Sequence, residues 1–496
     1  MKITNFRFDS KFLFISSASI FISMLYILPY ILLDRYQVDD LGRSIIGYTK
    51  WSSNGRPLAD YLMIAINAGY PIFDLSPLTQ ILSVSSICFA LTAYTWNYVS
   101  EDKKFQAAAT VFMFVANPFF LECLSFKFDS LTMGLSAALL IFLFTINTSI
   151  FGAAVSVFLI VCSLSLYQAT IGVYLIFTLI DYTLKCNTSD KNPDFIKYFS
   201  YRAMLIILAY TIYHFTIKLL FINDAYSISH SSTIPLNIEG VNIFINNFNR
   251  LLSLIMMYVN SAPWPFVVFY VILTTYSIVV IIREIISKHS KFPIYSLMLI
   301  SVSPLLIFFL TFLHISSLSS PVFAPRVLIS FGGLLFYISL LWVITVKRKW
   351  VAILAILPIA GFSFVHSYAV ANAAKAQDKL DDLILSSVAY DISHSGKQFE
   401  TLAIYGTMPS ADQRTLVTDR LPVTKSILPI FLNTNDYWGG MKLRHYMVKY
   451  HYDKIGEQDI YFMCKHPPIA QSSIYSLFAN DRKLILAFRK PNCDDK

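Results

Sequence analysis

The chain has 496 residues, of which 56% are hydrophobic and 14% are charged, and its mean hydropathy is +0.57. These values exclude an ordinary soluble protein and indicate a polytopic membrane protein. The formal net charge of +9 does not indicate nucleic-acid binding, because Lys and Arg are concentrated in short links between apolar segments.

Eleven apolar segments are long enough to cross the roughly 30 Å of hydrocarbon in a bilayer. They lie near residues 12–33, 78–98, 106–122, 130–147, 150–166, 169–184, 203–222, 264–282, 292–313, 327–346 and 350–370. The first follows Lys2, Arg7 and Lys11 and has no small-residue cleavage site behind it, so we expect an uncleaved anchor. The predicted fold is an all-α polytopic bundle of about eleven transmembrane helices.

The links between these segments differ in basic residues. If the N-terminus lies in the cytoplasm, the inner links contain Lys103, Lys104, Lys185 and the run at residues 347–349, whereas the outer links contain few cations. Cytoplasmic links are enriched in Lys and Arg, so this orientation is favoured. An odd number of spans then places the C-terminus on the outer side.

Two adjacent acids, Asp39 and Asp40, stand in the first outer link, followed by Arg43, Trp51 and Arg56. A carboxylate at the water–lipid boundary can act as a general base toward a hydroxyl group. Trp51 offers a ring on which a sugar can stack, and the cations can hold a phosphate. The alternative is that the acids are solvated and simply pair with Arg43. The position of the link favours catalysis, and the spacing does not distinguish which acid is the base.

Three further outer links carry polar residues that we expect to contact the donor phosphate or sugar. Lys127 and Asp129 lie between the third and fourth segments, Gln168 follows the fifth, and Arg326 precedes the tenth. A guanidinium at a helix start can hold a phosphate through two hydrogen bonds. Each residue also has an ordinary structural explanation: Lys127 could extend to the interface, Gln168 could cap a helix, and Arg326 could anchor one.

The composition changes near residue 370. Residues 1–370 form the predicted membrane domain, whose outer loop at 34–77 carries the acidic pair. Residues 61–77 and 238–262 have apolar faces interrupted by Asn, Gly or Pro, and we expect them to lie in the plane of the interface. Residues 371–496 form a predicted small, water-facing α+β domain.

Within the C-terminal domain we expect a helix at residues 374–390 and strands at TLAIYG, DIYFMC and KLILAF. Cys464 and Cys493 both fall in this domain. They could form a disulfide in an oxidising compartment, although separate thiols are the favoured expectation.

Signals of several common activities are absent from the sequence. It has no GxxxxGK[ST] phosphate loop, no HExxH motif and no GxSxG elbow, and its cysteines lack the spacing of a metal site. No series of acids lies within the predicted spans, which argues against an ion-coupled transporter. We expect that no metal or other cofactor is required, although two adjacent acids are compatible with a divalent cation.

Motifs on the predicted outer face extend over roughly the first 370 residues. They are Asp39-Asp40, Arg43, Trp51, Gly55-Arg56-Pro57, Asn117-Pro118-Phe119, Ser125-Phe126-Lys127-Phe128-Asp129-Ser130, Tyr167-Gln168-Ala169 and Pro325-Arg326. In these motifs the chain resembles the GT-C glycosyltransferases, membrane enzymes that use polyprenyl-phosphate sugars. More narrowly, it resembles the Gtr-type O-antigen glucosyltransferases, which change the serotype of enteric bacteria.

The resemblance implies glucose transfer on the periplasmic side of the bacterial inner membrane. Undecaprenyl-phosphate glucose would be the donor, and an O-antigen repeat of lipopolysaccharide, still on its lipid carrier, the acceptor. The expected mechanism is an inverting displacement with Asp39 or Asp40 as base, and with Lys127, Arg326 or Arg56 stabilising the leaving phosphate. The alternatives are a lipid-linked oligosaccharide flippase, which forms no glycosidic bond, and a GT-C transferase of another sugar.

Overall fold

The structure, a computed structural model, describes residues 8–188, 193–222, 225–289 and 292–493. Lys2 and Arg7, which were expected to precede the first span, lie outside the described residues. The chain divides into two compact units: the first comprises residues 1–32 and 49–368, and the second comprises residues 33–48 and 369–496. The main part of the second unit therefore starts close to residue 370, as expected, and the unit also includes the short segment at 33–48 that carries the acidic pair.

Long apolar helices make up most of the first unit. Seven helices among the described residues are long and apolar enough to cross a membrane: α1 (Ser10–Leu33), α4 (Leu78–Thr95), η4 with α9 (Gln168–Thr188), α10 with η5 and α11 (Phe195–Phe221), α14 (Trp264–Lys288), η6 with α17 (Pro325–Thr345) and α18 (Lys349–His394). Shorter apolar helices are α3 (Pro57–Ile66), α7 with η3 (Ser130–Thr145), α8 (Ile150–Leu166) and α15 (Ile294–Leu310). Every predicted apolar segment is thus largely helical, but eleven full-length spans are not supported.

The third predicted span is bent rather than straight. α5 (Lys104–Val115) and α6 (Pro118–Ser125) meet at 64°. Pro118 stands in the first turn of α6, where its missing N–H leaves no helical hydrogen bond unmade. Asn117 caps this turn by accepting from the Phe119 amide at 3.0 Å, and its own amide donates to the Ile329 carbonyl at 2.8 Å. The Asn-Pro motif therefore ends one helix, starts the next and fastens the bend to the segment before α17.

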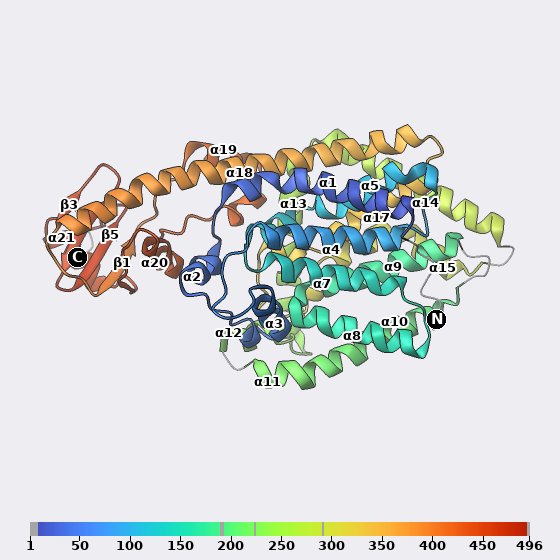
Figure 1. Cartoon of the computed structure of the whole chain (residues 1–496), viewed down its shortest axis with the longest axis horizontal. Coiled ribbons are helices and arrows are strands. Elements are labelled where there is room, and N and C mark those ends of the chain that lie inside the picture. Colours follow the sequence, from blue (N-terminus) through green and yellow to red (C-terminus); the bar gives the residue numbers. More distant parts are fainter. Residues whose placement is uncertain (1–7, 189–192, 223–224, 290–291, 494–496) are drawn as a thin grey trace. The chain divides into compact units, whose positions relative to one another are not determined.

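Small residues allow the central helices to approach closely. Figure 1 shows α4, α7, α8 and α9 running side by side. A Cβ atom on Gly134 of α7 would lie 2.0 Å from the Ser83 hydroxyl of α4, and that hydroxyl donates to the Ser130 carbonyl at 2.7 Å. Close packing at glycine and interhelical bonds from serine are typical of helices in a membrane, where apolar burial alone does not drive association.

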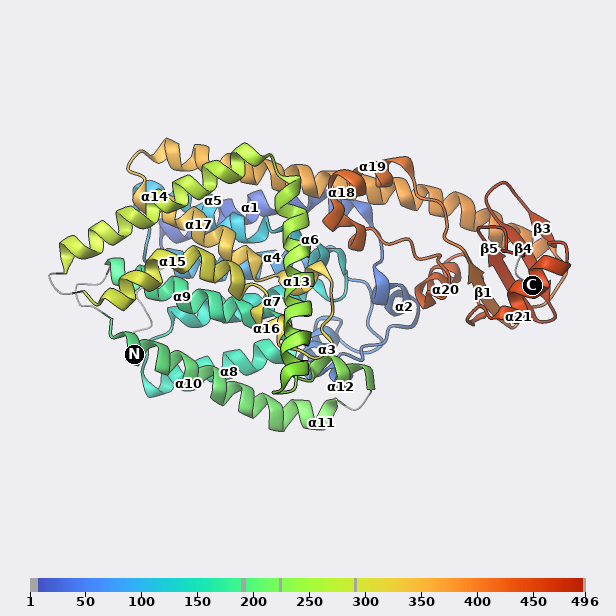
Figure 2. The ribbon, with the colours of Figure 1, turned by 180° about the vertical axis from the view of Figure 1, so that it is seen from behind.

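One long helix runs in a different direction. Figure 2 shows α13 (Ile238–Ser261) crossing the axes of the other helices of the first unit. Its Asn247 is buried and donates to the Leu318 carbonyl at 2.8 Å and the Ser316 carbonyl at 3.3 Å. This orientation is the one expected for a helix in the plane of the interface.

Short elements link the helices at the two ends of this bundle. They are η1 (Ser52–Asn54), η2 (Glu101–Lys103), η3 (Leu143–Thr145), η4 (Gln168–Thr170), α12 (Ala225–Ser231), α16 (Leu313–Ser316) and η6 (Pro325–Leu328). We call the end formed by residues 49–77, 117–129, 167–170 and 313–330 the loop end. The opposite end, formed by residues 96–104, 143–149, 181–188 and 343–349, we call the basic end.

Hydrogen bonds connect the links of the basic end. Lys103 Nζ donates to the carbonyls of Val343 at 2.5 Å and Val346 at 3.2 Å, and the Tyr98 hydroxyl donates to Asp181 at 3.3 Å. The links predicted to be cytoplasmic are thus gathered at one end and those predicted to be outer at the other. Which end faces the cytoplasm stays a prediction.

A five-stranded sheet forms the centre of the second unit. Its order is β2-β1-β5-β4-β3, with β1 (Thr401–Tyr405), β2 (His451–Tyr452), β3 (Ala470–Gln471), β4 (Ser476–Asn480) and β5 (Lys483–Ala487). β1 is parallel to β2 and β5, whereas β4 is antiparallel to β5 and β3. The unit also contains α2 (Val38–Ile46), α19 (Asp412–Arg420), η7 (Pro422–Ser426), α20 (Tyr437–Arg444), α21 (Glu457–Lys465) and the end of α18.

The structure corrects two expectations about this unit. The strands at TLAIYG and KLILAF are confirmed as β1 and β5, but DIYFMC lies in α21. The Asp459 carboxylate accepts from the Gly456 amide at 2.9 Å and so starts a helix. Cys464 at the end of this helix forms a disulfide with Cys493, where separate thiols were expected.

Candidate active site at the loop end

A buried tryptophan and a buried acid connect two distant links at the loop end. Trp51 is fully buried, and its indole Nε1 donates to Asp129 Oδ1 at 2.6 Å. Arg56 Nη1 lies 3.4 Å from the same oxygen. Asp129 stands directly before α7, so the N-terminus of that helix fixes its backbone. Two donors from the loop at residues 49–56 therefore meet one carboxylate from the link between α6 and α7.

Asp60 holds this loop in shape. Asp60 lies in the first turn of α3, where its Oδ1 accepts from the Trp51 amide at 2.9 Å and its Oδ2 from the Ser52 amide at 2.8 Å. The Ser52 hydroxyl also donates to Oδ2. An acid in the first turn of a helix is favoured by the helix dipole, and here it also satisfies two N–H groups of the preceding turn. Asp60 is thus a positioning residue for Trp51.

Gln168, from the link after α8, holds the turn at Asn54 and Gly55 that follows Trp51. Its amide donates to the Asn54 carbonyl at 2.8 Å and the Gly55 carbonyl at 3.2 Å, and the Tyr213 hydroxyl donates to the Gly55 carbonyl at 2.9 Å. Gly55 has a φ of 72°, and a Cβ there would lie 2.6 Å from the Tyr213 hydroxyl. Only glycine fits both this backbone conformation and this space.

Two further cations at this end form ion pairs between links. Lys127 is only 4% exposed, and its Nζ lies 3.0 Å from Asp74 Oδ2. Arg326 contacts both oxygens of Glu122: its Nη1 donates to Oε1 at 2.6 Å and its backbone amide to Oε2 at 2.7 Å. A buried cation needs such a partner. Lys127 is thus buried in an ion pair with Asp74, whereas the alternative weighed from the sequence has its side chain extending to the interface.

An aromatic ring lies between these groups. The Tyr167 hydroxyl donates to the Arg326 carbonyl at 3.4 Å, and the Arg56 guanidinium lies 5.8 Å from the centre of the Tyr167 ring. The groups of the loop end are therefore joined through Tyr167 and Gln168, which occupy neighbouring positions after α8. The Tyr-Gln dipeptide connects the Trp51 loop with the turn that carries Arg326.

The acidic pair lies on α2, in the second unit. Asp39 and Arg43 form an i,i+4 ion pair at 3.7 Å, with the Asp39 side chain 42% exposed. Asp40 is fully buried. α2 ends at Gly47, which has a φ of 69° and donates its amide to the Arg43 carbonyl. The pairing with Arg43 weighed from the sequence is thus present for Asp39.

Six of the predicted site residues come together in the first unit: Trp51, Arg56, Lys127, Asp129, Gln168 and Arg326. The sequence placed Glu122 on the same face as Lys127 and Asp129 but gave no role to Asp60, Asp74 or Tyr213. An acid in a predicted first helical turn was the available signal for Asp60. Tyr213 lies inside a predicted span and gave no signal.

Three cations of the loop end, Arg56, Lys127 and Arg326, each lie beside a carboxylate from another link or helix. Such pairs can bind a phosphate when it competes with the carboxylate for the cation. The expectation that a sugar stacks on Trp51 does not fit the structure, because the Trp51 ring is fully buried and its Nε1 is bonded to Asp129. Among the described residues, no group of three or more His, Cys, Asp or Glu side chains is arranged to hold a metal ion. The expectation that no cofactor is needed stays a prediction.

Comparison with known proteins identifies the chemistry. A family model described as "Glucosyl transferase GtrII" matches residues 28–337, a stretch that contains every predicted site residue. The protein is therefore a glycosyltransferase, with seven or eight helices able to cross a membrane among the described residues. The chain belongs to the GtrII family of glucosyl transferases.

A relative is known from a bacteriophage. The chain is 28% identical over 450 residues to an "uncharacterized 55.3 kDa protein in gtrB 5′ region" of Salmonella phage P22, and the alignment covers 87% of this chain and 90% of that protein. No solved structure matches the chain significantly. The resemblance to Gtr-type glucosyltransferases that the motifs indicated is confirmed at the level of the family.

Proposed function

We propose that this glucosyltransferase takes glucose from undecaprenyl-phosphate glucose and transfers it to an O-antigen repeat of lipopolysaccharide on its lipid carrier. The reaction takes place at the periplasmic face of the bacterial inner membrane, where nucleotide sugars are not available. The observation that supports it most strongly is that Arg56, Lys127 and Arg326, from three separate links, lie at one end of the helix bundle, each paired with a different carboxylate. A lipid phosphate is the ligand that such a cluster at a membrane surface suits best.

The proposed reaction is a single displacement with inversion. The acceptor hydroxyl oxygen attacks the anomeric carbon of glucose, and a carboxylate takes the hydroxyl proton. The bond between the anomeric carbon and the phosphate oxygen breaks, and its electrons leave with undecaprenyl phosphate. Arg326, Lys127 or Arg56 stabilises the negative charge on that phosphate. No general acid is needed, because the phosphate is already a competent leaving group.

The proposed base is Asp39 or Asp40. Asp39 is the more exposed of the two and is paired with Arg43, so its carboxylate is accessible to an incoming hydroxyl. Asp40 is buried in the same helical turn, where it is suited to fix the orientation of α2. Asp129 is the less suitable base, because its Oδ1 already accepts from Trp51 and Arg56. We assign Asp129 to the positioning of the Trp51 loop and the sugar.

The test is glucose transfer by the purified full-length protein, with radiolabelled polyprenyl-phosphate glucose and a lipid-linked O-antigen acceptor. Asp39→Asn and Asp40→Asn, made separately, are compared with Asp481→Asn. Asp481 is exposed in a turn of the second unit at a φ of 50°, a conformation that asparagine tolerates, so this control keeps full activity.

Loss of a general base lowers the rate by about 10²–10⁴-fold, and we expect this for at least one of the two acids. Full activity in both variants would remove the assignment of the base. Membrane insertion and the thermal unfolding midpoint of each variant are measured alongside, so that a folding defect is recognised.

The same assay separates the alternatives. Family membership favours an enzyme over a flippase, and a flippase would produce no labelled glycan. A transferase of another sugar would leave the glucose donor unused and accept a polyprenyl-phosphate mannose or aminoarabinose instead. Mass analysis of the product identifies the sugar added.

A further inference from the structure

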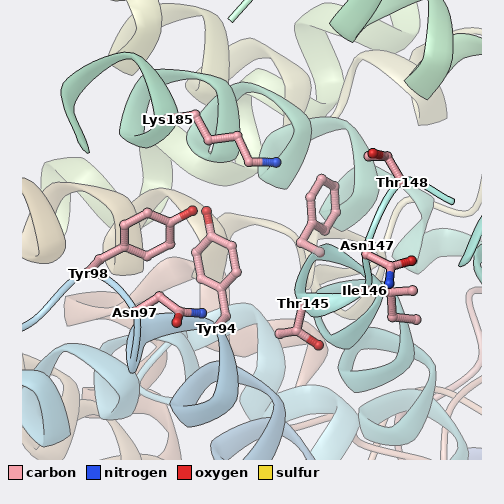
Figure 3. Close-up of a pocket in the computed structure, with 9 residues that line it drawn as sticks. Tyr94, Asn97, Tyr98, Thr145, Ile146, Asn147, Thr148 and Lys185 are labelled. Atoms are coloured by element: carbon pink, nitrogen blue, oxygen red, sulfur yellow. The ribbon is translucent and has the colours of Figure 1, made fainter. Parts of the chain in front are cut away.

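A cavity lies at the basic end of the first unit, opposite the candidate active site. It has a volume of about 240 Å³ and is lined by residues from the end of α4, the link between α7 and α8, and the last turns of α9. Figure 3 shows that the Lys185 ammonium and the hydroxyls of Tyr94 and Tyr98 all point into this space. Asn97 and Thr148 at its edge are exposed, so the cavity is open to the outside.

The acid beside this cavity is already saturated with donors. Asp181 is buried, and its Oδ2 accepts from Lys185 at 2.8 Å, Tyr198 at 2.6 Å and Arg202 at 3.3 Å. Its Oδ1 accepts from Tyr98 at 3.3 Å. Two cations thus share one carboxylate, which leaves one positive charge in excess. Lys185 carries three N–H donors, and one of them is used on Asp181.

A buried hydroxyl in the wall makes no hydrogen bond of normal geometry. The Tyr94 hydroxyl is buried and lies beside the Tyr98 hydroxyl, with which it interacts, but no described residue bonds to it at an ordinary distance and angle. A buried polar group without a partner is destabilising by roughly 1–3 kcal/mol unless a ligand or water satisfies it. Because this hydroxyl points into the same cavity as Lys185 (Figure 3), one ligand can contact both.

The cavity is rich in donors and small. Its polar lining consists of the Lys185 ammonium group, the Tyr94 hydroxyl, the Tyr98 hydroxyl, which already donates to Asp181, and amide and hydroxyl groups from Asn97, Thr145, Asn147 and Thr148. The excess positive charge excludes a cation. The volume is below the roughly 300–1,000 Å³ of sites that enclose drug-sized ligands, which excludes a nucleotide or an oligosaccharide. A compact anion with several acceptor oxygens fits both properties.

We propose that this cavity, formed by Lys185, Tyr94 and Tyr98, binds the phosphate group of an anionic ligand at the end of the bundle opposite the candidate active site. Two sources share this chemistry, the headgroup of an anionic phospholipid and free inorganic phosphate. The basic end carries further cations in its links, and such groups attract anionic lipids at a membrane surface. The inference rests on the cavity alone and does not depend on the proposed sugar transfer.

The test uses full-length protein in neutral detergent and records the thermal unfolding midpoint against ligand concentration. The probes are short-chain phosphatidylglycerol, inorganic phosphate, and a diacylglycerol with the same acyl chains but no phosphate. Lys185→Gln removes the charge, and Asp181 keeps its bonds to Arg202, Tyr198 and Tyr98. Tyr94→Phe removes only the Tyr94 hydroxyl, and it serves as a second variant if the first one folds poorly. Lys104→Gln is the matched control, since Lys104 lies at the same end but pairs with exposed Glu101.

The expected result is a rise in the midpoint with a phosphate-bearing probe. The apparent affinity falls about tenfold or more in Lys185→Gln and about two- to tenfold in Tyr94→Phe, and is unchanged in Lys104→Gln. A response to phosphatidylglycerol alone identifies the lipid headgroup as the source, and an equal response to inorganic phosphate identifies the free anion. Equal responses of the wild type and both cavity variants, or an equal response to diacylglycerol, would overturn the proposal.

Discussion

The contact between Trp51 and Asp129 allows a quantitative prediction for sugar transfer. Trp51→Phe keeps a buried aromatic ring but removes the Nε1–H that donates to Asp129 at 2.6 Å. A hydrogen bond to a charged group contributes about 1.5–3 kcal/mol, and Arg56, a second donor to Asp129, lies further away at 3.4 Å. If this bond holds the loop in its active shape, kcat/KM falls by about 10- to 100-fold.

A matched control is present at the other end of the bundle. Trp96 Nε1 donates to the Asp9 carboxylate at 3.1 Å, so Trp96→Phe removes the same kind of bond at the basic end. We expect this variant to lose some thermal stability and to keep its transferase activity. The comparison separates an effect on the candidate site from a general effect of losing an indole group.

A double-mutant cycle tests whether Trp51 acts through Asp129. Asp129→Asn keeps an acceptor oxygen but removes the charge, so the bond to Trp51 weakens to that between neutral groups, about 0.5–1.5 kcal/mol. Trp51→Phe should therefore cost less activity in the Asp129→Asn background than in the wild type. The reasoning is refuted if Trp51→Phe is fully active, or if it costs the same in both backgrounds.

Three other predictions follow from single features of the two units. Gly55→Ala strains a left-handed turn by roughly 1–3 kcal/mol and meets the Tyr213 hydroxyl, so transfer activity should be lost and the unfolding midpoint should fall by about a few degrees; an active variant would contradict the fixed turn. Removing the Cys464–Cys493 disulfide, which closes a separation of 29 residues, should destabilise the second unit by about 2–4 kcal/mol, measured by hydrogen exchange of its strands with and without reductant. Burial is the main cause that lowers the pKa of His445 below its usual 6.5; its stabilising contribution is complete above pH 6.5 and is lost as the pH falls through the lowered value. The protection of α2 amides, taken relative to the intrinsic exchange rate at each pH, should therefore fall on acidification, and in a His445→Gln variant it should not.

The sequence alone determined the class of protein and which of the predicted site residues share one end of the helix bundle. Apolar segments of the right length predicted the helices because hydropathy and length are local properties. The alternation of basic links predicted which residues share an end of the bundle. This alternation places six predicted site residues at one end, and the structure has them at the loop end: Trp51, Arg56, Lys127, Asp129, Gln168 and Arg326.

Only the tertiary structure decided which site residues pair with one another and which segments differ from the expected structure. Trp51 and Asp129 are 78 residues apart, Lys127 and Asp74 are 53 apart, and Arg326 and Glu122 are 204 apart, so no local pattern could pair them. The helix α21 and the disulfide at its end also depended on context, because a short apolar run fits a strand or a helix until capping groups and neighbours select one. The segment with Asp39 and Asp40 also joins the second unit through tertiary contacts. There α2 packs on α20, and His445 hydrogen-bonds the Leu41 carbonyl at 3.3 Å. These residues are about 400 positions apart, and only packing brings them together.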